Sequence, residues 1–175
     1  MNPCKWEFWG AIFTMIAGTL LHFVYQWANG AWWASILGAV NESTWEHLKM
    51  LFWPMVLFGT IEYFFWGWKK TNFIPVKVLS IVIGMLVIIV LFYTYTGILG
   101  KNLFIPNILT FILGIVSAAF VSCKLLQTDK LSGTTAFWAG WITLILLIAA
   151  FVFFTWSPPA IGLFKDPVSG EYGIK

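Results

Sequence analysis

The sequence has no arginine and few charged residues of any kind. All ten basic residues are lysines, so the planar guanidinium groups that bind phosphates and base edges in pairs of hydrogen bonds are missing. Charged residues make up 10% of the chain and hydrophobic residues 60%, with a mean hydropathy of +0.85. A water-soluble domain of 175 residues could not bury so much apolar surface. These shortages exclude nucleic acid as a partner and indicate an integral membrane protein surrounded by membrane lipids.

The sequence also lacks linkers, internal repeats and a cleavable leader. No Ser/Gly/Pro-rich stretch or long charged tail separates the apolar segments, which indicates a single membrane domain over residues 1–175. No half of the chain repeats the other, as it does in inverted-repeat transporters. The first apolar segment is too long and too rich in tryptophan for a signal peptide, and no small-residue cleavage site follows it. We therefore expect this segment to be retained as a membrane span.

Five long apolar segments predict an all-α integral membrane bundle, because each is long enough to cross about 30 Å of hydrocarbon. The predicted transmembrane helices cover residues 6–28, 44–68, 76–99, 104–126 and 134–156. Residues 31–40 are apolar but too short to span, which predicts a short interfacial or re-entrant segment between the first two helices. Prolines and glycines in residues 157–175 predict an ordered, non-helical C-terminal tail.

Three local patterns add detail to these spans. Pro54 removes one backbone hydrogen bond from the second span and predicts a kink there. Gly114 and Ala118 are four residues apart in the fourth span and predict a face on which two helices pack closely. Glu62 lies in the far half of the second span, where Lys69 or Lys70 could neutralise it by extending along the helix surface.

The lysines orient the bundle across the membrane. Six of them fall on the side of the N-terminus and four on the other side, so the positive-inside rule favours a cytoplasmic N-terminus and an outer C-terminus. The loop between the first two spans and the tail then share the outer face. Cys4 and Cys123 fall near the cytoplasmic surface, where thiols stay reduced, and we expect no disulfide.

The most polar stretch of the chain reads NESTWEHLK and begins at Asn41. It contains two carboxylates, an imidazole and an amine at the start of the second span. Ser43 and Glu46 have the spacing of a capping box, in which the Ser43 hydroxyl accepts from the Glu46 amide and the Glu46 carboxylate accepts from the Ser43 amide. Capping accounts for none of Asn41, Glu42 and His47, so these three residues are left for a functional role.

The two histidines of the chain are expected at similar depths. His22 lies about 9 Å inside the outer end of the first span, and His47 about one turn into the second. Ionisable groups at membrane depth indicate a functional site. We predict an outer-face pocket over which the tail folds. Its expected zinc ligands are His22, His47 and Glu42, its catalytic residues Glu42, Glu46, His47 and Asp166, and its substrate-binding residues Asn41, Trp45, Tyr93 and Tyr95.

Three classes of function remain open. The first is an enzyme that carries out metal-assisted hydrolysis or group transfer on a lipid or another membrane-surface substrate. Adjacent helical residues point about 100° apart, so Glu46 and His47 are not expected to share one metal; no H-E-x-x-H pattern occurs either. The second is a small homodimeric transporter that uses His22 and Glu62 as polar stations. The third is a structural or partner-binding subunit, and a binding or catalytic site on the outer face is favoured over it.

Several of these motifs together resemble a known group of proteins. NESTWEHLK, the FYTYTG run beginning at Phe92 and the tail pattern PP…LF-x-DP…G-x-YGI are similar to those of an uncharacterised family of small bacterial integral membrane proteins. The resemblance covers essentially the whole chain and implies a multi-pass protein of the bacterial cytoplasmic membrane, without an activity. The chain departs from the family pattern at Ala160, where a polar residue or histidine is expected, so a tail histidine cannot be a ligand here.

Overall fold

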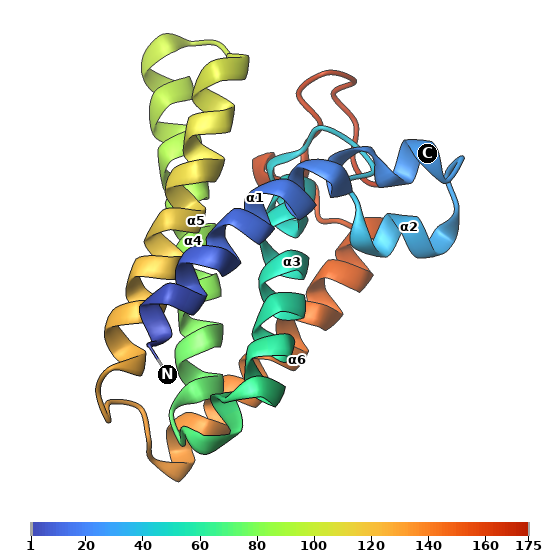
Figure 1. Ribbon diagram of the computed structural model, residues 1–175. Helices are drawn as coiled ribbons and strands as arrows, with labels where there is room; N and C mark the ends of the chain where they lie inside the picture. Colours follow the sequence, from blue (N-terminus) through green and yellow to red (C-terminus); the bar gives the residue numbers. More distant parts are fainter. Residues whose placement is uncertain (1, 175) are drawn as a thin grey trace.

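The computed structural model describes residues 2–174, and the regular secondary structure of this part of the chain is helical. Its α-helices are α1 (Pro3–Trp27), α2 (Trp32–Leu37), α3 (Thr44–Phe65), α4 (Phe73–Leu99), α5 (Phe104–Leu126) and α6 (Thr134–Trp156), and its 3₁₀ turns are η1 (Gly67–Lys69) and η2 (Gly162–Phe164). All the α-helices except α2 are long and apolar enough to cross a membrane. The prediction of an all-α bundle with five candidate spans is confirmed, and the chain has the character of a multi-pass membrane protein (Figure 1).

The helix boundaries follow the predicted spans closely. α5 and α6 begin and end at the predicted residues. α1 begins at Pro3 instead of residue 6, because the side chain of Asn2 accepts a hydrogen bond from the backbone N of Cys4 and proline suits the first helical position. α3 ends three residues early, because the chain tightens into η1 before α4 begins.

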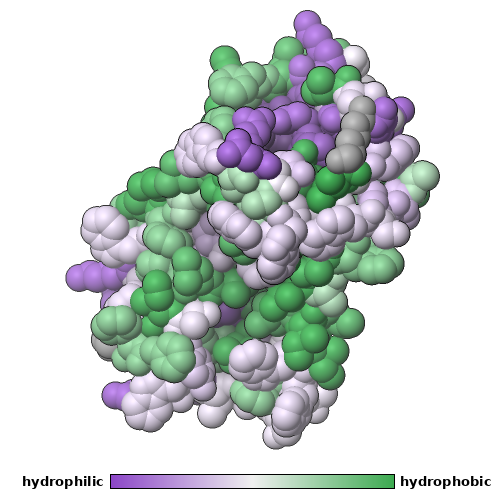
Figure 2. Space-filling model, turned by 90° about the vertical axis from the view of Figure 1, so that its right-hand side faces the viewer, coloured by the Kyte–Doolittle hydropathy of each residue, from purple (hydrophilic) through white to green (hydrophobic). Residues whose placement is uncertain are grey.

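α3 lies at the centre of the bundle (Figure 1). α4 and α5 form a long antiparallel hairpin on one side of it, and α1 crosses the front obliquely. α6 lies on the other side and packs against α4 at the end opposite the tail, where Gly140 meets Pro75. The largest group of buried apolar side chains brings α3 together with α4, α5 and α6: Leu48, Leu51, Phe52, Ile81, Met85, Ile88, Ile115 and Phe151. In Figure 2 polar residues gather at one end of the molecule and apolar residues cover most of the surface below them, as a bilayer requires.

Small residues set the distance between α4 and α5. A Cβ atom on Gly84 would lie 2.9 Å from the carbonyl oxygen of Gly114 and 3.0 Å from Cβ of Ala118. The two helices are therefore in contact through backbone atoms at this level. The predicted close-packing face at Gly114 and Ala118 is confirmed, and α4 supplies its other half.

α1 approaches α3 through a second glycine. Pro54 has no N–H to donate to the carbonyl of Met50 one turn earlier, although α3 continues through it as one helix. A Cβ atom on Gly18 would lie only 2.3 Å from that carbonyl oxygen. The backbone of α1 thus packs directly on the carbonyl that Pro54 leaves free, and this contact places His22, one turn further along α1, beside the start of α3.

The two cysteines are not free, which corrects the prediction. A disulfide joins Cys4 on α1 to Cys123 on α5, with Cα atoms 4.7 Å apart. The prediction was wrong because it rested on the expected compartment and ignored that α1 and α5 pack together at this end of the bundle. Disulfides persist in oxidising compartments, so this bond weighs against the cytoplasmic N-terminus that the lysines favour.

The loops divide between two ends of the bundle. The tail side carries the loop after α2, the loop between α4 and α5, and the C-terminal tail, whereas the opposite side carries the N-terminus and the loops before α4 and α6 (Figure 1). Two lysines in the described part of the chain lie inside the bundle and not at either surface. Lys49 and Lys77 are buried and ion-paired with glutamates, so they do not contribute to the charge bias of the loops.

Candidate metal site and cavity

Three of the predicted site residues meet on the tail side. Nε2 of His22 lies 3.6 Å from Oε1 of Glu42, and Nε2 of His47 lies 3.4 Å from Oε2 of the same carboxylate. One ligand atom from each of the three residues can be chosen so that all lie within 4.8 Å of one another. The histidines come from α1 and α3, and Glu42 lies in the loop that leads into α3, so the site depends on the close approach of the two helices.

The orientation of His47 is set by the backbone. Its Nδ1 lies 2.8 Å from the carbonyl oxygen of Ser43, which can only accept, so Nδ1 carries a proton and donates. In the neutral ring, Nε2 then presents a lone pair toward the carboxylate of Glu42. Two lone pairs facing each other are unfavourable, so this arrangement favours a positive charge at Nε2, either a proton or a metal ion.

Glu42 is the charged group of this cluster that lies outside the helices. The hydrogen bond with His47 is the largest of the influences that hold the pKa of Glu42 below its usual value. Partial burial of the carboxyl and the nearby charge of Asp166 act in the opposite direction. Glu42 therefore stays ionised at neutral pH and supplies the negative charge of the cluster.

A cavity of about 320 Å³ opens beside these three residues. Its walls are mostly apolar and come from α1, α3, α4 and α5. The lining includes the phenylalanines Phe23, Phe92, Phe104 and Phe111, together with Met50, Ile88 and Ile108. Polar side chains also reach it, among them Asn102 and Asn107, which the sequence did not identify as site residues. The cavity combines a large apolar lining with a few convergent polar groups, as ligand sites do.

Glu46 does not belong to this cluster. It is 2% exposed and its carboxylate lies 2.6 Å from Nζ of Lys49. Its Oε2 also accepts from the backbone N of Val40 at 3.1 Å. The capping box is only half formed: the amide of Glu46 donates to the Ser43 hydroxyl at 3.4 Å, but the amide of Ser43 donates to Asn41 instead. The prediction that the Glu46 carboxylate returns to Ser43 is wrong, because Lys49 draws it inward.

Lys49 explains much of the NESTWEHLK stretch. Its ammonium is fully buried and donates to the carbonyl oxygen of Ser35 at 2.8 Å and the hydroxyl of Thr155 at 2.6 Å, besides Glu46. Ser35 lies in α2 and Thr155 in α6. One buried ion pair thus ties α2, α3 and α6 together, and the adjacent Glu46 and His47 serve different neighbours, as their 100° separation requires.

Asn41 and Trp45 hold the tail in place. The Asn41 side chain donates to the carbonyl oxygen of Gly173 at 3.0 Å and accepts from the amide of Ser43. The Trp45 ring packs on Phe151 of α6 and on Phe164 of the tail, with centroids 4.6 and 4.9 Å away. Neither residue lines the cavity, so the structure places both where they join the tail to the bundle.

Tyr93, Tyr95 and Asp166 surround the cluster at a greater distance. The Tyr95 hydroxyl bonds to the side chains of Asn102 and Asn107 and so reaches the cavity only through them. Tyr93 is half-exposed and does not line the cavity. Asp166 accepts from the amide of Val168 and the hydroxyl of Ser169 and lies near enough to Glu42 to influence its charge.

A second cluster of buried charges lies on the opposite side and was missed. Lys77 of α4 contacts both Glu7 of α1 and Glu62 of α3. Glu62 therefore pairs with Lys77, and the predicted pairing with Lys69 or Lys70 is wrong because those residues lie beyond the end of α3. The predicted spans began at residues 6 and 76 and so placed Glu7 and Lys77 at their ends; the observed helices begin at Pro3 and Phe73, which puts both residues about one turn inside, level with Glu62 near the end of α3.

Comparison with known proteins gives one result. The family described as "Family of unknown function (DUF6512)" matches residues 1–174, and the chain belongs to this family, in agreement with the resemblance seen in its motifs. No curated protein and no solved structure gives a significant match.

Proposed function

We propose that this member of the DUF6512 family binds a zinc ion through His22, Glu42 and His47 and uses it for hydrolysis or group transfer on a lipid-like substrate. The observation that carries the proposal is the meeting of three ligand atoms within 4.8 Å at the edge of a largely apolar cavity.

The distances are close to those of a zinc site. Ligand atoms about 2.0–2.2 Å from a tetrahedral ion lie about 3.3–3.6 Å from one another. Nε2 of His22 lies 3.6 Å from one oxygen of Glu42, and Nε2 of His47 lies 3.4 Å from the other oxygen. A set with one ligand atom from each residue lies within 4.8 Å, so zinc binding would draw these side chains together by about 1 Å. The bond from His47 Nδ1 to the Ser43 carbonyl is the kind of outer contact that orients metal-binding histidines. Two histidines and one carboxylate leave a fourth position open, as catalytic zinc sites do.

The cavity supports an amphiphilic substrate. A chain of aliphatic carbons would contact the phenylalanine-rich walls, while a polar headgroup would face the three ligands and the amides of Asn102 and Asn107. Since the walls come from membrane-spanning helices, a lipid can enter from the bilayer without crossing water. This favours a lipid over a water-soluble metabolite.

The chemistry assigns different tasks to the residues around the ion. A bound zinc ion supplies a Lewis acid and an activated water at neutral pH. His47 is held in one orientation by Ser43, and Glu42 balances the positive charge. Asp166 is the second carboxylate near Glu42, and we assign to it the acceptance of a proton from the attacking water. Glu46 has no direct part, because its carboxylate is held by Lys49.

Elemental analysis of the detergent-purified protein tests the proposal. We expect one zinc per chain, and loss of that metal in His22→Ala, Glu42→Gln and His47→Ala. Glu171→Gln removes an exposed tail carboxylate and is the matched control, which should keep the metal. Lipid mass spectrometry of the same samples should recover a bound lipid. A metal-free wild-type protein that stays metal-free after incubation with zinc would refute the proposal.

A further inference from the structure

We infer that Glu7, Lys77 and Glu62 form a second site, separate from the metal cluster, that binds and releases one proton within the membrane. The three side chains come from α1, α4 and α3, and all are buried.

The charges of this site do not balance. One ammonium faces two carboxylates, since Nζ of Lys77 lies 2.6 Å from Oε1 of Glu7 and also contacts Oε2 of Glu62. α5 contributes the hydroxyl of Ser122, which donates to Glu7, and the ammonium of its Lys124 lies over the ring of Phe120. With both carboxylates ionised the cluster carries one net negative charge. A buried uncompensated charge is far more costly than a neutral group, so uptake of one proton stabilises the cluster.

The hydrogen bonds indicate which carboxylate holds the proton. Oε1 of Glu7 accepts from both Lys77 and Ser122, at 2.6 and 2.7 Å, and such donors favour the ionised form. Glu62 is completely buried, and its Oε1 has no hydrogen-bond partner. An ionised oxygen without a donor is unfavourable there, so we place the proton on Oε1 of Glu62.

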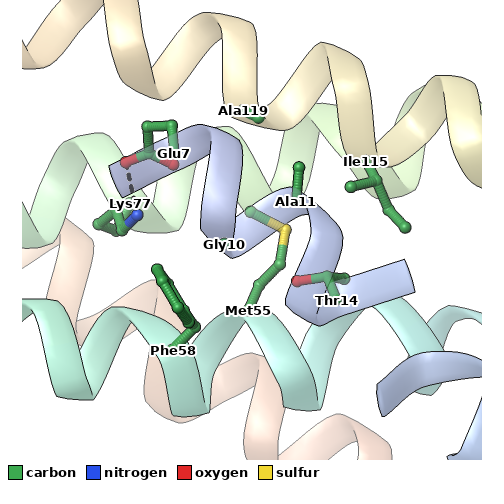
Figure 3. A pocket seen from close by; sticks show the side chains of 9 residues that line it. All are labelled: Glu7, Gly10, Ala11, Thr14, Met55, Phe58, Lys77, Ile115 and Ala119. Carbon is green, nitrogen blue, oxygen red and sulfur yellow. Dashed lines mark hydrogen bonds and ion pairs between the residues drawn. The ribbon is translucent and has the colours of Figure 1, made fainter. Parts of the chain in front are cut away.

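A small cavity lies beside two of the three residues, Glu7 and Lys77. It has a volume of about 10 Å³, enough for about one water molecule. Figure 3 shows Glu7 and Lys77 at one end of it and Thr14 at the other, with Met55 and Phe58 of α3 between them. A water held by these polar groups can pass a proton to the cluster: one O–H bond of a hydronium ion breaks, an O–H bond forms on Glu7, and a neutral water remains. Lys77, which contacts both carboxylates, can then give one of its own protons to Glu62 and take up the proton of Glu7. Release is the reverse step.

Infrared spectroscopy of the purified protein tests this directly, because a protonated carboxyl has a carbonyl band that a carboxylate lacks. At neutral pH we expect this band in the wild-type protein, and its loss in Glu62→Gln. It should also be lost in Glu7→Gln, because the remaining carboxylate then pairs with Lys77 and needs no proton. Asp129→Asn removes an exposed carboxylate on the same side and should leave the band unchanged.

Exchange into D₂O separates a proton that moves from one that is locked in place. The proposal expects the band to shift on transfer to D₂O and to weaken as the pH is raised. His47→Ala should leave the band intact, even if it abolishes metal binding, so the two sites can fail independently. Two results would overturn the proposal: a spectrum that is the same in wild type and Glu62→Gln, or a band that never shifts in D₂O. A band that appears only when sodium is removed would also overturn it and would indicate a sodium site.

Discussion

Removing the buried ammonium of Lys49 should destabilise the protein strongly. In Lys49→Met the carboxylate of Glu46, only 2% exposed, loses the lysine with which it forms its ion pair, and the carbonyl oxygen of Ser35 and the hydroxyl of Thr155 lose a donor. Breaking one partner of a buried ion pair costs about 3–5 kcal/mol. We expect a loss of this size in the free energy of unfolding, measured by tryptophan fluorescence in detergent, because Trp45 lies in the same helix as the pair, next to Glu46.

The double variant Glu46→Gln/Lys49→Met isolates the reason for this loss. Replacing a buried ion pair by neutral groups of similar volume is often neutral or stabilising, so the double variant should be more stable than Lys49→Met alone. Lys165→Met removes an exposed lysine of the tail and should change stability by less than about 0.5 kcal/mol. The single variant Glu46→Gln completes the comparison: if its loss and that of Lys49→Met simply add in the double variant, the pair is not coupled and our interpretation of this stretch is wrong.

The same double variant also tests the role of Glu46. Because the proposed metal site does not include this residue, the folded double variant should bind as much zinc as the wild type. A folded protein that has lost its metal would return Glu46 to the catalytic residues, where the sequence had placed it.

Three further predictions concern other parts of the structure. Gly18→Ala should lower the free energy of unfolding by about 1–3 kcal/mol and weaken metal binding, because the new methyl group would lie 2.3 Å from a backbone oxygen. Gly97→Ala is the control, because its methyl group would enter open space; equal effects of the two changes on thermal unfolding would contradict the prediction. Cys4→Ser should lower the free energy of unfolding by about 2–5 kcal/mol, because it removes the disulfide. Peptide mass mapping of protein alkylated in intact cells should recover the linked peptides of Cys4 and Cys123; alkylation of these two thiols would argue against the disulfide. The lowered pKa of Glu42 contributes stability above its ordinary value of 4.5 that is lost as the pH falls through the lower folded value. His47→Gln should flatten this acid-side dependence in melting curves, and an unchanged profile would separate Glu42 from His47.

The sequence predicted the fold well because span length and hydropathy determine most of it. A bilayer demands about 20 apolar residues in each span, and α5 and α6 begin and end at the predicted residues. The depths of His22 and His47 also followed from counting 1.5 Å per residue. These quantities depend only on position along each helix axis, which a sequence states directly.

The rotation of each helix about its axis was much harder to predict. Tyr95 lies at the correct end of α4, yet it reaches the cavity only through Asn102 and Asn107. Glu46 lies next to His47 in sequence and faces away from it, toward Lys49. The direction in which a helical side chain points depends on which helices pack beside it, and for Lys49 these are α2 and α6, which supply its hydrogen-bond partners. The sequence alone does not show which helices become neighbours.

The two charged clusters are best regarded as separate sites. His47 and Glu62 both belong to α3 and are 15 residues apart, which is about 22 Å along the helix axis. Between them α3 contributes Leu48, Leu51 and Phe52 to the apolar core. The residues that the transport hypothesis would use, His22 and Glu62, therefore belong to clusters at opposite ends of the bundle. The apolar core lies between them, with one cavity on either side of it, at Thr14 and at Met50. A polar path through one chain would have to cross this core, so the geometry favours a surface reaction at the metal cluster over passage of a substrate from one cluster to the other.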